Sequence, residues 1–443
     1  MIDIHNLIET YSNEYSLYGK PIEVNFREML PDLNKSERYT HSIHPYPAKL
    51  LCHIPYFFLQ TDDLCPKHGV VLDPFCGTGT VALETVLTGR WAYGADANPL
   101  ARKITRVKLQ YIPKRSLENT LSSIIKVVHN VTEITIDDDS LQMWYSDKVL
   151  LELLKLSHVI SSIRVGKIRD FFEVCLSVTA RKVSIADPRI AVPVRLNPER
   201  FKTSPTNYKT ARQQLLDAKN ADVVARFEQI ARVNIERVQS LKYVRVQSEV
   251  ISDDARRLSQ KYHSRKMLPA ESVDMILTSP PYAGAQKYIR ASRLNLYWLG
   301  IRSTEQIHTL NDKNIGREDY HKKQIVRLST GIPAADEILH KLYDEGKRER
   351  AFIVGNYLLE MQQALNESIR VLKTGGTMVL VIGNNTVCGQ EFDTQDYLSS
   401  YLQKKGLKLK FKLIDSIKSY GLMTKRNKTA SRISREWILV FKK

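Results

Sequence analysis

A short turn at residues 278–282 (Thr-Ser-Pro-Pro-Tyr) carries the side chains best suited to chemistry. It follows residues 273–277, an apolar run typical of a buried strand. The two prolines stiffen the turn and offer carbonyl oxygens but no N–H groups. Ser279 precedes a proline and is therefore expected to be extended. Such a turn can accept hydrogen bonds from an exocyclic NH2 group, and Tyr282 can stack on the ring that carries it. The pattern predicts a site for a nucleobase amine.

A glycine-rich turn lies much earlier in the chain. Residues 70–72 (Val-Val-Leu) form a strand pattern that runs into residues 73–80 (Asp-Pro-Phe-Cys-Gly-Thr-Gly-Thr), and a helical pattern follows at 81–87. Glycines between a strand and a helix let the backbone approach a ligand closely. A second strand pattern, residues 91–95, ends at Asp96. An acidic residue about twenty positions after such a turn suits a ribose diol.

In this order, the two motifs resemble those of the S-adenosylmethionine-dependent amino-methyltransferases of DNA, which methylate the exocyclic nitrogen of cytosine or adenine. Residues 44–49 (His-Pro-Tyr-Pro-Ala-Lys) resemble a third, cofactor-side motif of that family. The resemblance covers residues 41–110, 245–300 and 365–443. It implies S-adenosylmethionine as the cofactor, double-stranded DNA as the substrate and a cognate restriction endonuclease as a candidate partner.

The resemblance also implies a role for each matching residue. Asp73 and the glycine turn would cradle the methionine part of the cofactor, flanked by Tyr46 and Lys49, while Asp96 would accept from the ribose and Asp254 from the adenine amine. The expected cofactor-binding residues are Tyr46, Lys49, Asp73, Phe75, Gly77, Gly79, Thr80, Asp96 and Asp254. The expected catalytic residues are Ser279, Pro280, Pro281 and Tyr282, and no metal ligands are expected.

The acceptor amine is a poor nucleophile, because its lone pair is conjugated into the ring. Carbonyl oxygens of Ser279 and Pro280 can accept its two protons, which lets the nitrogen pyramidalise and attack the methyl group in line. Alignment and electrostatic preorganisation then supply the rate, with no covalent intermediate. A stacked base cannot reach such a site, so it must be flipped out. Stacking on Tyr282 would recover about 1–3 kcal/mol of that cost.

Four interpretations of these motifs compete: three activities and a binding protein without activity. Serine at position 279 favours cytosine N(4) as the acceptor, with adenine N(6) as the alternative because both occur with this turn. A guanine amino-methylase of RNA would also place a glycine turn before a Pro-Pro-aromatic turn. A nucleic-acid-binding scaffold without activity would predict damaged motifs, yet both are intact. Methylation of cytosine carbon 5 is disfavoured, since the chain has no Pro-Cys dipeptide to supply the nucleophile.

Alternating strand and helix patterns predict an α/β fold with a doubly wound, mostly parallel sheet. By resemblance this is the Rossmann-like methyltransferase fold, with a mainly helical insertion domain. If the strand order is 3-2-1-4-5, the strands before Asp73 and Thr278 are neighbours where the order reverses, which is where such sheets bind ligands. The glycine turn and the Ser-Pro-Pro-Tyr turn would then face each other across one crevice.

Three segments are expected along the chain. Residues 1–110 hold a polar lead-in and the cofactor half of the sheet. Residues 111–240 read as helical apart from a proline-spaced loop at 188–205. Residues 241–443 hold the catalytic half, with strands expected at 243–255, 377–383, 407–417 and 435–442 and a loop insertion near 301–350.

The net charge of +18 favours a phosphate-rich partner. The helical insertion at 111–240 is the candidate for DNA target recognition, although it precedes the third strand, which departs from the family pattern. Phosphate contacts are expected from Arg181, Lys182, Arg189, Arg195, Arg200 and Lys202.

Composition sets the expected compartment. No apolar run reaches the ~20 residues of a membrane helix, and the first residues lack the pattern of a signal peptide. Five scattered cysteines suggest free thiols in a reducing cytosol. A cytoplasmic protein is therefore expected.

Overall fold

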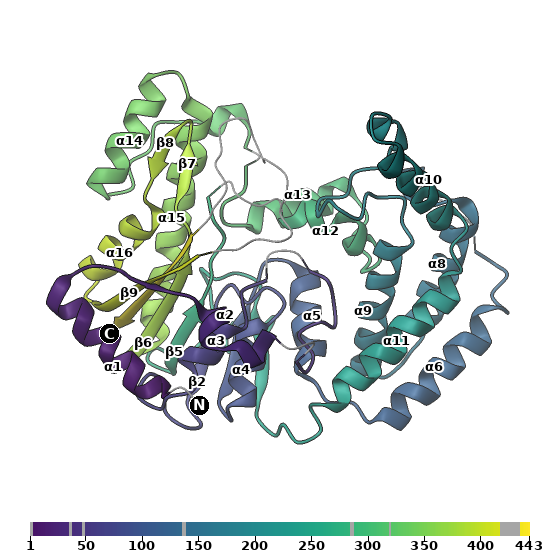
Figure 1. Ribbon diagram of the computed structural model, residues 1–443, viewed down its shortest axis with the longest axis horizontal. Coiled ribbons are helices and arrows are strands. Elements are labelled where there is room, and N and C mark those ends of the chain that lie inside the picture. Colours follow the sequence, from purple (N-terminus) through teal and green to yellow (C-terminus); the bar gives the residue numbers. More distant parts are fainter. Residues whose placement is uncertain are drawn as a thin grey trace.

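A mixed, mostly parallel β-sheet forms the centre of the protein in a computed structural model (Figure 1). The structure describes residues 3–34, 38–46, 49–134, 139–283, 288–318, 320–416 and 435–443. Within these residues the sheet has eight strands: β1 (Ile22–Val24), β2 (Val70–Asp73), β3 (Trp91–Ala95), β4 (Ser248–Ser252), β5 (Val273–Thr278), β6 (Leu372–Ile382), β9 (Lys408–Ser416) and β10 (Arg435–Lys442).

The strand order is β1-β9-β10-β6-β5-β2-β3-β4, so the doubly wound α/β prediction is confirmed. Strands β2 to β6 run parallel, whereas β10 is antiparallel to both β6 and β9. The chain builds outward from β2 to β4 and then returns to place β5 on the other side of β2. The order therefore reverses between β2 and β5, which pair directly through Val71↔Met275 and Leu72↔Ile276.

Helices cover both faces because the strands are apolar on both sides. In β6, Val379 and Val381 join the core under α1 (Ile4–Tyr18), α2 (Phe26–Met29) and α3 (His53–Phe58). Met378, Leu380 and Ile382 alternate with them and pack against α15 (Arg348–Val371) and α16 (Thr394–Lys404) on the opposite face. Two further helices, α4 (Thr80–Leu87) and α5 (Pro99–Leu109), follow β2 and β3.

A group of helices, α6 to α11, stands beside the sheet and is called the helical lobe below (Figure 1). Its members are α6 (Lys114–Val128), α7 (Asp139–Gln142), α8 (Asp147–Ser161), α9 (Gly166–Lys182), α10 (Pro205–Lys219) and α11 (Val223–Gln239). All of them except α10 share a core that includes Phe171, Phe172 and Phe227 and that continues into α5 of the sheet unit. The loop predicted at 188–205 is confirmed up to Ser204, since α10 begins at Pro205; it contains the short 3-10 turn η2 (Pro198–Phe201) and an isolated β-bridge from Arg195 to Ala186.

The second insertion is more helical than expected. It contains α12 (Tyr288–Tyr297), α13 (Thr304–Lys313), the 3-10 turn η3 (Lys322–Gln324) and α14 (Pro333–Asp344). The predicted loop near 301–350 therefore narrows to residues 314–332, because helices occupy its two ends. A hairpin of β7 (Asn385–Val387) and β8 (Gln390–Phe392) follows β6.

Two strand boundaries were predicted wrongly. Strand β4 begins at Ser248 rather than near 243, because turns after α11 occupy the earlier residues: Val244 N donates to Leu241 O at 3.0 Å. Strand β6 begins at Leu372 and runs through Gly375 and Gly376, five residues earlier than the apolar run suggested. Strand β1 and the 3-10 turn η1 (Pro31–Asn34) had no clear signal in the polar lead-in.

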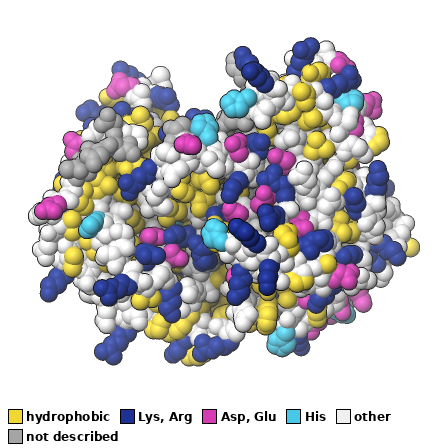
Figure 2. Space-filling model, turned by 180° about the vertical axis from the view of Figure 1, so that it is seen from behind, with side chains coloured by type: hydrophobic (Ala, Val, Ile, Leu, Met, Phe, Trp, Pro, Cys, Tyr) yellow, Lys and Arg dark blue, Asp and Glu magenta, His cyan; other side chains and the backbone are white. Residues whose placement is uncertain are grey.

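The molecule has two raised ends. In Figure 1, α14 with the β7–β8 hairpin stands at one end and α10 at the other, with α12 and α13 between them. Figure 2 shows the opposite face, hollowed between these ends, with Lys and Arg side chains spread over both. None of the helices in the described ranges is long and apolar enough to cross a membrane.

Candidate active site

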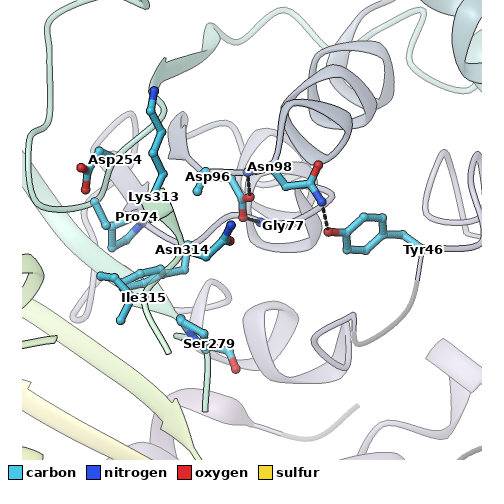
Figure 3. A pocket seen from close by; sticks show the side chains of 14 residues that line it. Tyr46, Pro74, Gly77, Asp96, Asn98, Asp254, Ser279, Lys313, Asn314 and Ile315 are labelled. Atoms are coloured by element: carbon cyan, nitrogen blue, oxygen red, sulfur yellow. Dashed lines mark hydrogen bonds between the residues drawn. The ribbon is translucent and has the colours of Figure 1, made fainter. Parts of the chain in front are cut away.

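One cavity lies at the carboxyl ends of the central strands (Figure 3). Seven of the thirteen predicted site residues line it, from both halves of the sheet: Tyr46, Phe75, Gly77, Asp96, Asp254, Ser279 and Pro281. The glycine turn and the Ser-Pro-Pro-Tyr turn therefore meet at one cavity, as the strand order requires. The other six, Lys49, Asp73, Gly79, Thr80, Pro280 and Tyr282, are not among its lining residues.

A buried hydrogen bond joins the two turns directly. Thr278 Oγ1, at the end of β5, donates to Asp73 Oδ1 at 2.6 Å, and the same oxygen accepts from Phe75 N at 3.1 Å. Burial raises the pKa of Asp73 to about 7, although both hydrogen bonds favour its ionised form. Asp73 thus holds the turns together from beneath the cavity, rather than lining it.

The two glycines of the glycine turn, Gly77 and Gly79, have different structural roles. Both have left-handed backbone conformations, with φ of +51° at Gly77 and +73° at Gly79. A Cβ at Gly77 would have no neighbour within 4 Å, whereas one at Gly79 would lie 2.8 Å from Thr105 Cγ2. Gly77 therefore leaves space in the cavity, and Gly79 allows α4 to pack against α5.

Asp96 ties the end of β3 to this turn. Its Oδ2 accepts from Gly77 N at 2.9 Å and its Oδ1 from Asn98 N at 2.8 Å (Figure 3). Burial raises the pKa of Asp96, while these two backbone donors lower it. The carboxylate is thus fixed at the cavity wall.

The Ser-Pro-Pro-Tyr turn spans the cavity and the sheet edge beside it. Ser279 and Pro281 face the cavity, whereas the Tyr282 hydroxyl donates to Glu436 Oε1 at 3.0 Å. A Cβ at Gly316 would lie 3.4 Å from the carbonyl oxygen of Tyr282, so this glycine lets a second loop pass close to the turn.

Comparison with known proteins agrees with this geometry. Residues 273–443, from β5 to the end of the chain, match the sequence profile of the N6/N4 methyltransferases, described as DNA methylase. This match assigns the C-terminal part of the chain to the N6/N4 DNA methylase family.

Individual relatives of this methylase are distant. Type II methyltransferase M.MvaI of Kocuria varians is 24% identical over 399 residues, which span 83% of this chain and 82% of that protein. Type II methyltransferase M.MjaII of Methanocaldococcus jannaschii is 27% identical over 113 residues, 24% of this chain and 20% of that protein. The solved rRNA methyltransferase aviRa of Streptomyces viridochromogenes aligns with a TM-score of 0.29 at 11% identity, covering 90% of this chain and 88% of that one.

Asn98 is a residue of the methylase site that sequence reasoning missed. Its Nδ2 donates to the Tyr46 hydroxyl at 2.9 Å and to Ser292 Oγ at 3.1 Å, while its Oδ1 caps α5. It therefore holds Tyr46 at the cavity wall. The Asn-Pro start of α5 was a visible capping signal, but nothing local pointed to Tyr46.

Lys49 does not contact the cavity. Its Nζ donates to the carbonyl oxygens of His41 (3.1 Å) and His44 (2.6 Å), and burial lowers its pKa to about 8. The fully buried Glu84 of α4 binds the same segment, through Arg38 and His41. These contacts anchor the residues that lead to Tyr46. Pro47 and Ala48 of the predicted motif lie outside the described residues.

A second missed feature covers the far end of the cavity. Lys313, Asn314 and Ile315, where α13 ends, line it beside Asp254, and Lys313 pairs with Asp253 (2.8 Å). Asp254 pairs with Arg256 (2.9 Å), and Glu360 Oε1 accepts from Arg256 (3.4 Å) and Arg317 (3.1 Å). Glu360 therefore connects Arg256, the partner of Asp254, to Arg317 of the loop that follows α13. The further lining residues are Pro74, Ala97 and Ala255.

In the described part of the chain, no group of three or more His, Cys, Asp or Glu side chains could hold a metal ion. All five cysteines are free thiols, and Cys76 of the glycine turn is buried.

The raised pKa of Asp73 predicts a pH-dependent stability. Because the folded state keeps the Asp73 proton up to about pH 7 while the unfolded chain loses it near 3.8, stability falls as pH rises through this window. Asp73→Asn keeps the acceptor oxygen but cannot titrate. As pH rises through this window, the free energy of unfolding of the wild type should therefore fall relative to that of the variant, by on the order of a few kcal/mol. Urea unfolding at pH 5, 6 and 7 measures it, with the exposed Asp217→Asn as the control. Parallel slopes for the wild type and Asp73→Asn would contradict the prediction.

Proposed function

We propose that this methylase transfers a methyl group from S-adenosylmethionine to the exocyclic N(4) of a flipped-out cytosine in a specific DNA sequence. The observation that carries the proposal is the shared cavity: the glycine turn and the Ser-Pro-Pro-Tyr turn line it together, joined beneath by the Thr278–Asp73 hydrogen bond. A donor held by the first turn and an acceptor amine held by the second would be within reach of each other.

The residues that line the cavity suit the chemistry of an adenosyl group. Phe75, Ala97 and Ile315 provide apolar walls for a flat ring, and the carboxylates of Asp96 and Asp254 provide acceptors for a diol and an amine. The open space beside Gly77 leaves the turn accessible to a ligand. When bound, S-adenosylmethionine would supply an activated methyl group on a sulfonium centre.

The protein's own part in the reaction is positioning. Carbonyl oxygens of Ser279 and Pro280 would accept the two amine protons, because neither proline offers a competing N–H. Tyr282 would stack on the flipped base and Pro281 would close the cavity side of the turn. The geometry then aligns the nitrogen for attack, which is the main source of rate in such a transfer.

Cytosine is proposed as the acceptor base because serine stands at position 279, and adenine N(6) is the second candidate. The two bases present their amines on rings of different size. The distinction therefore depends on the space that the Ser-Pro-Pro-Tyr turn leaves for the base.

We further propose that residues 1–110, 111–240 and 241–443 form the cofactor, target-recognition and catalytic segments, with the helical lobe reading DNA. The hollow between the two raised ends supports this assignment (Figure 2). Among the predicted phosphate contacts, Arg181, Arg189 and Lys202 already bind protein groups. The proposal therefore narrows to the exposed Lys182, Arg195 and Arg200.

The relatives named as type II methyltransferases support a role in restriction-modification. We therefore propose a restriction endonuclease with the same target sequence as the biological counterpart of this methylase.

Nucleoside analysis after incubation with tritiated S-adenosylmethionine and mixed DNA or RNA tests the function. Label in N(4)-methylcytosine supports the proposal, and label in N(6)-methyladenine selects the second candidate. Label in RNA nucleosides alone, or no transfer to any nucleic acid, would overturn it. Gly77→Val, whose side chain would fill the cavity, serves to check that any transfer depends on this site.

A further inference from the structure

The last strand of the sheet delivers a carboxylate to the catalytic edge. Because β10 is antiparallel to β6, its first residues lie beside the carboxyl end of β6, with Trp437 opposite Ile382. Glu436 precedes Trp437 and so reaches the edge where β5 ends in the Ser-Pro-Pro-Tyr turn. No sequence motif marks this glutamate.

Glu436 holds the aromatic residue of that turn. The Tyr282 hydroxyl donates to Glu436 Oε1 at 3.0 Å, across 154 residues of sequence. The next residue is also held, since Asn385 Nδ2 donates to Ala283 O at 2.8 Å. Together with the rigid Pro281 on the other side, these contacts leave the Tyr282 ring little freedom to rotate.

The charges around Glu436 disfavour an acidic side chain at this position if its role is packing alone. Asp415 of β9 lies opposite it in register, and burial raises the pKa of both carboxyl groups. Arg27 of α2 and the hydroxyl of Tyr282 act in the other direction and favour the ionised Glu436. Glu436 is half-buried, and an acid placed beside another acid is unfavourable unless a further contact compensates for it. The compensating contact here is made with the predicted base-stacking residue.

We propose that Glu436 is a positioning residue for methyl transfer, which fixes the ring plane of Tyr282 before the base arrives. The inference rests on the proposed function. A ring already oriented loses less freedom when the base stacks on it, so the benefit is in the reaction step. Glu436 does not line the cofactor cavity, and its loss should leave cofactor affinity unchanged.

Two substitutions at Glu436 separate positioning from packing. Glu436→Gln keeps an acceptor oxygen for the Tyr282 hydroxyl and should retain most of the activity. Glu436→Leu has similar size but no acceptor, and should lower the single-turnover methylation rate about tenfold, the scale of one lost hydrogen bond to a charged group. The dissociation constant for S-adenosylmethionine, measured by calorimetry, should be the same in both.

A double-mutant cycle tests whether Glu436 acts through Tyr282. In a Tyr282→Phe background, Glu436→Leu should cause no further loss of rate. The exposed Glu23→Gln is the control for an acid-to-amide change on the same sheet. Equal losses in the tyrosine and phenylalanine backgrounds, or equal rates for the Gln and Leu variants, would overturn the inference. Failure of the wild type to methylate any nucleic acid would instead overturn the proposed function.

Discussion

Gly77→Val is expected to abolish cofactor binding and leave the protein folded. Gly77 lines the cavity, and the space around its missing Cβ is open, so a valine side chain would occupy the volume a ligand needs. Affinity for S-adenosylmethionine, measured by isothermal calorimetry, should fall at least about a hundredfold, or roughly 2.7 kcal/mol. The left-handed backbone at this position adds a strain of about 1–2 kcal/mol, which a domain of ordinary stability tolerates.

Gly89→Val is the matched control for that strain. Gly89 also has a left-handed backbone (φ of +79°) and open space, but it lies in the turn between α4 and β3 and does not line the cavity. Gly79→Ala should instead lower the melting temperature, because its Cβ would collide with Thr105. Equal affinities in the Gly77→Val and Gly89→Val proteins would contradict a ligand-holding role for the turn.

Tyr282→Ala is expected to lower the methylation rate about 5- to 150-fold, which corresponds to the 1–3 kcal/mol of one base-aromatic stack. Cofactor affinity should be unchanged, because Tyr282 points toward Glu436 rather than into the cofactor cavity. Single-turnover transfer to duplex DNA and calorimetric binding of S-adenosylmethionine separate these two effects.

Tyr401→Ala is the matched control for Tyr282→Ala, because it removes a tyrosine side chain outside the site. Tyr401 of α16 packs against the same core as Tyr282, and its hydroxyl donates to Asn366 at 2.8 Å, outside the site. This variant should cost stability without affecting the rate. A rate in Tyr282→Ala that matches Tyr401→Ala would contradict the stacking role, as would a parallel loss of cofactor affinity.

The meeting of the two motifs could be predicted because it depends on topology alone. Val70–Asp73 and Val273–Thr278 are short apolar strands that each end in an unusual turn, and parallel strands bring their carboxyl ends to one edge. This prediction required no knowledge of the side-chain contacts between the two turns. The same reasoning located Asp96 and Asp254, since each follows a strand of that sheet.

Contacts made by side chains far apart in the chain could not be predicted in this way. Glu436, Glu360 and the end of α13 reach the site through packing that no local pattern encodes. Lys49 was misplaced for the same reason: a lysine near a cofactor motif fits a binding role, but its amino group instead caps two carbonyls of its own segment. The start of β4 was predicted too early because turns after α11 continue through residues 241–243, just before the β-branched Val244 and Val246.

The pairing of β2 with β5 also bears on how the polypeptide is made. Thr278 and Asp73 are 205 residues apart, so β2 leaves the ribosome long before the neighbour that completes it. Until β5 has been synthesised, one edge of β2 has no strand partner. The helices of the helical lobe leave the ribosome in this interval and can fold before β5 arrives. The nascent chain therefore passes through a prolonged aggregation-prone stage, in which chaperones that shield hydrophobic edges would raise the yield of active enzyme.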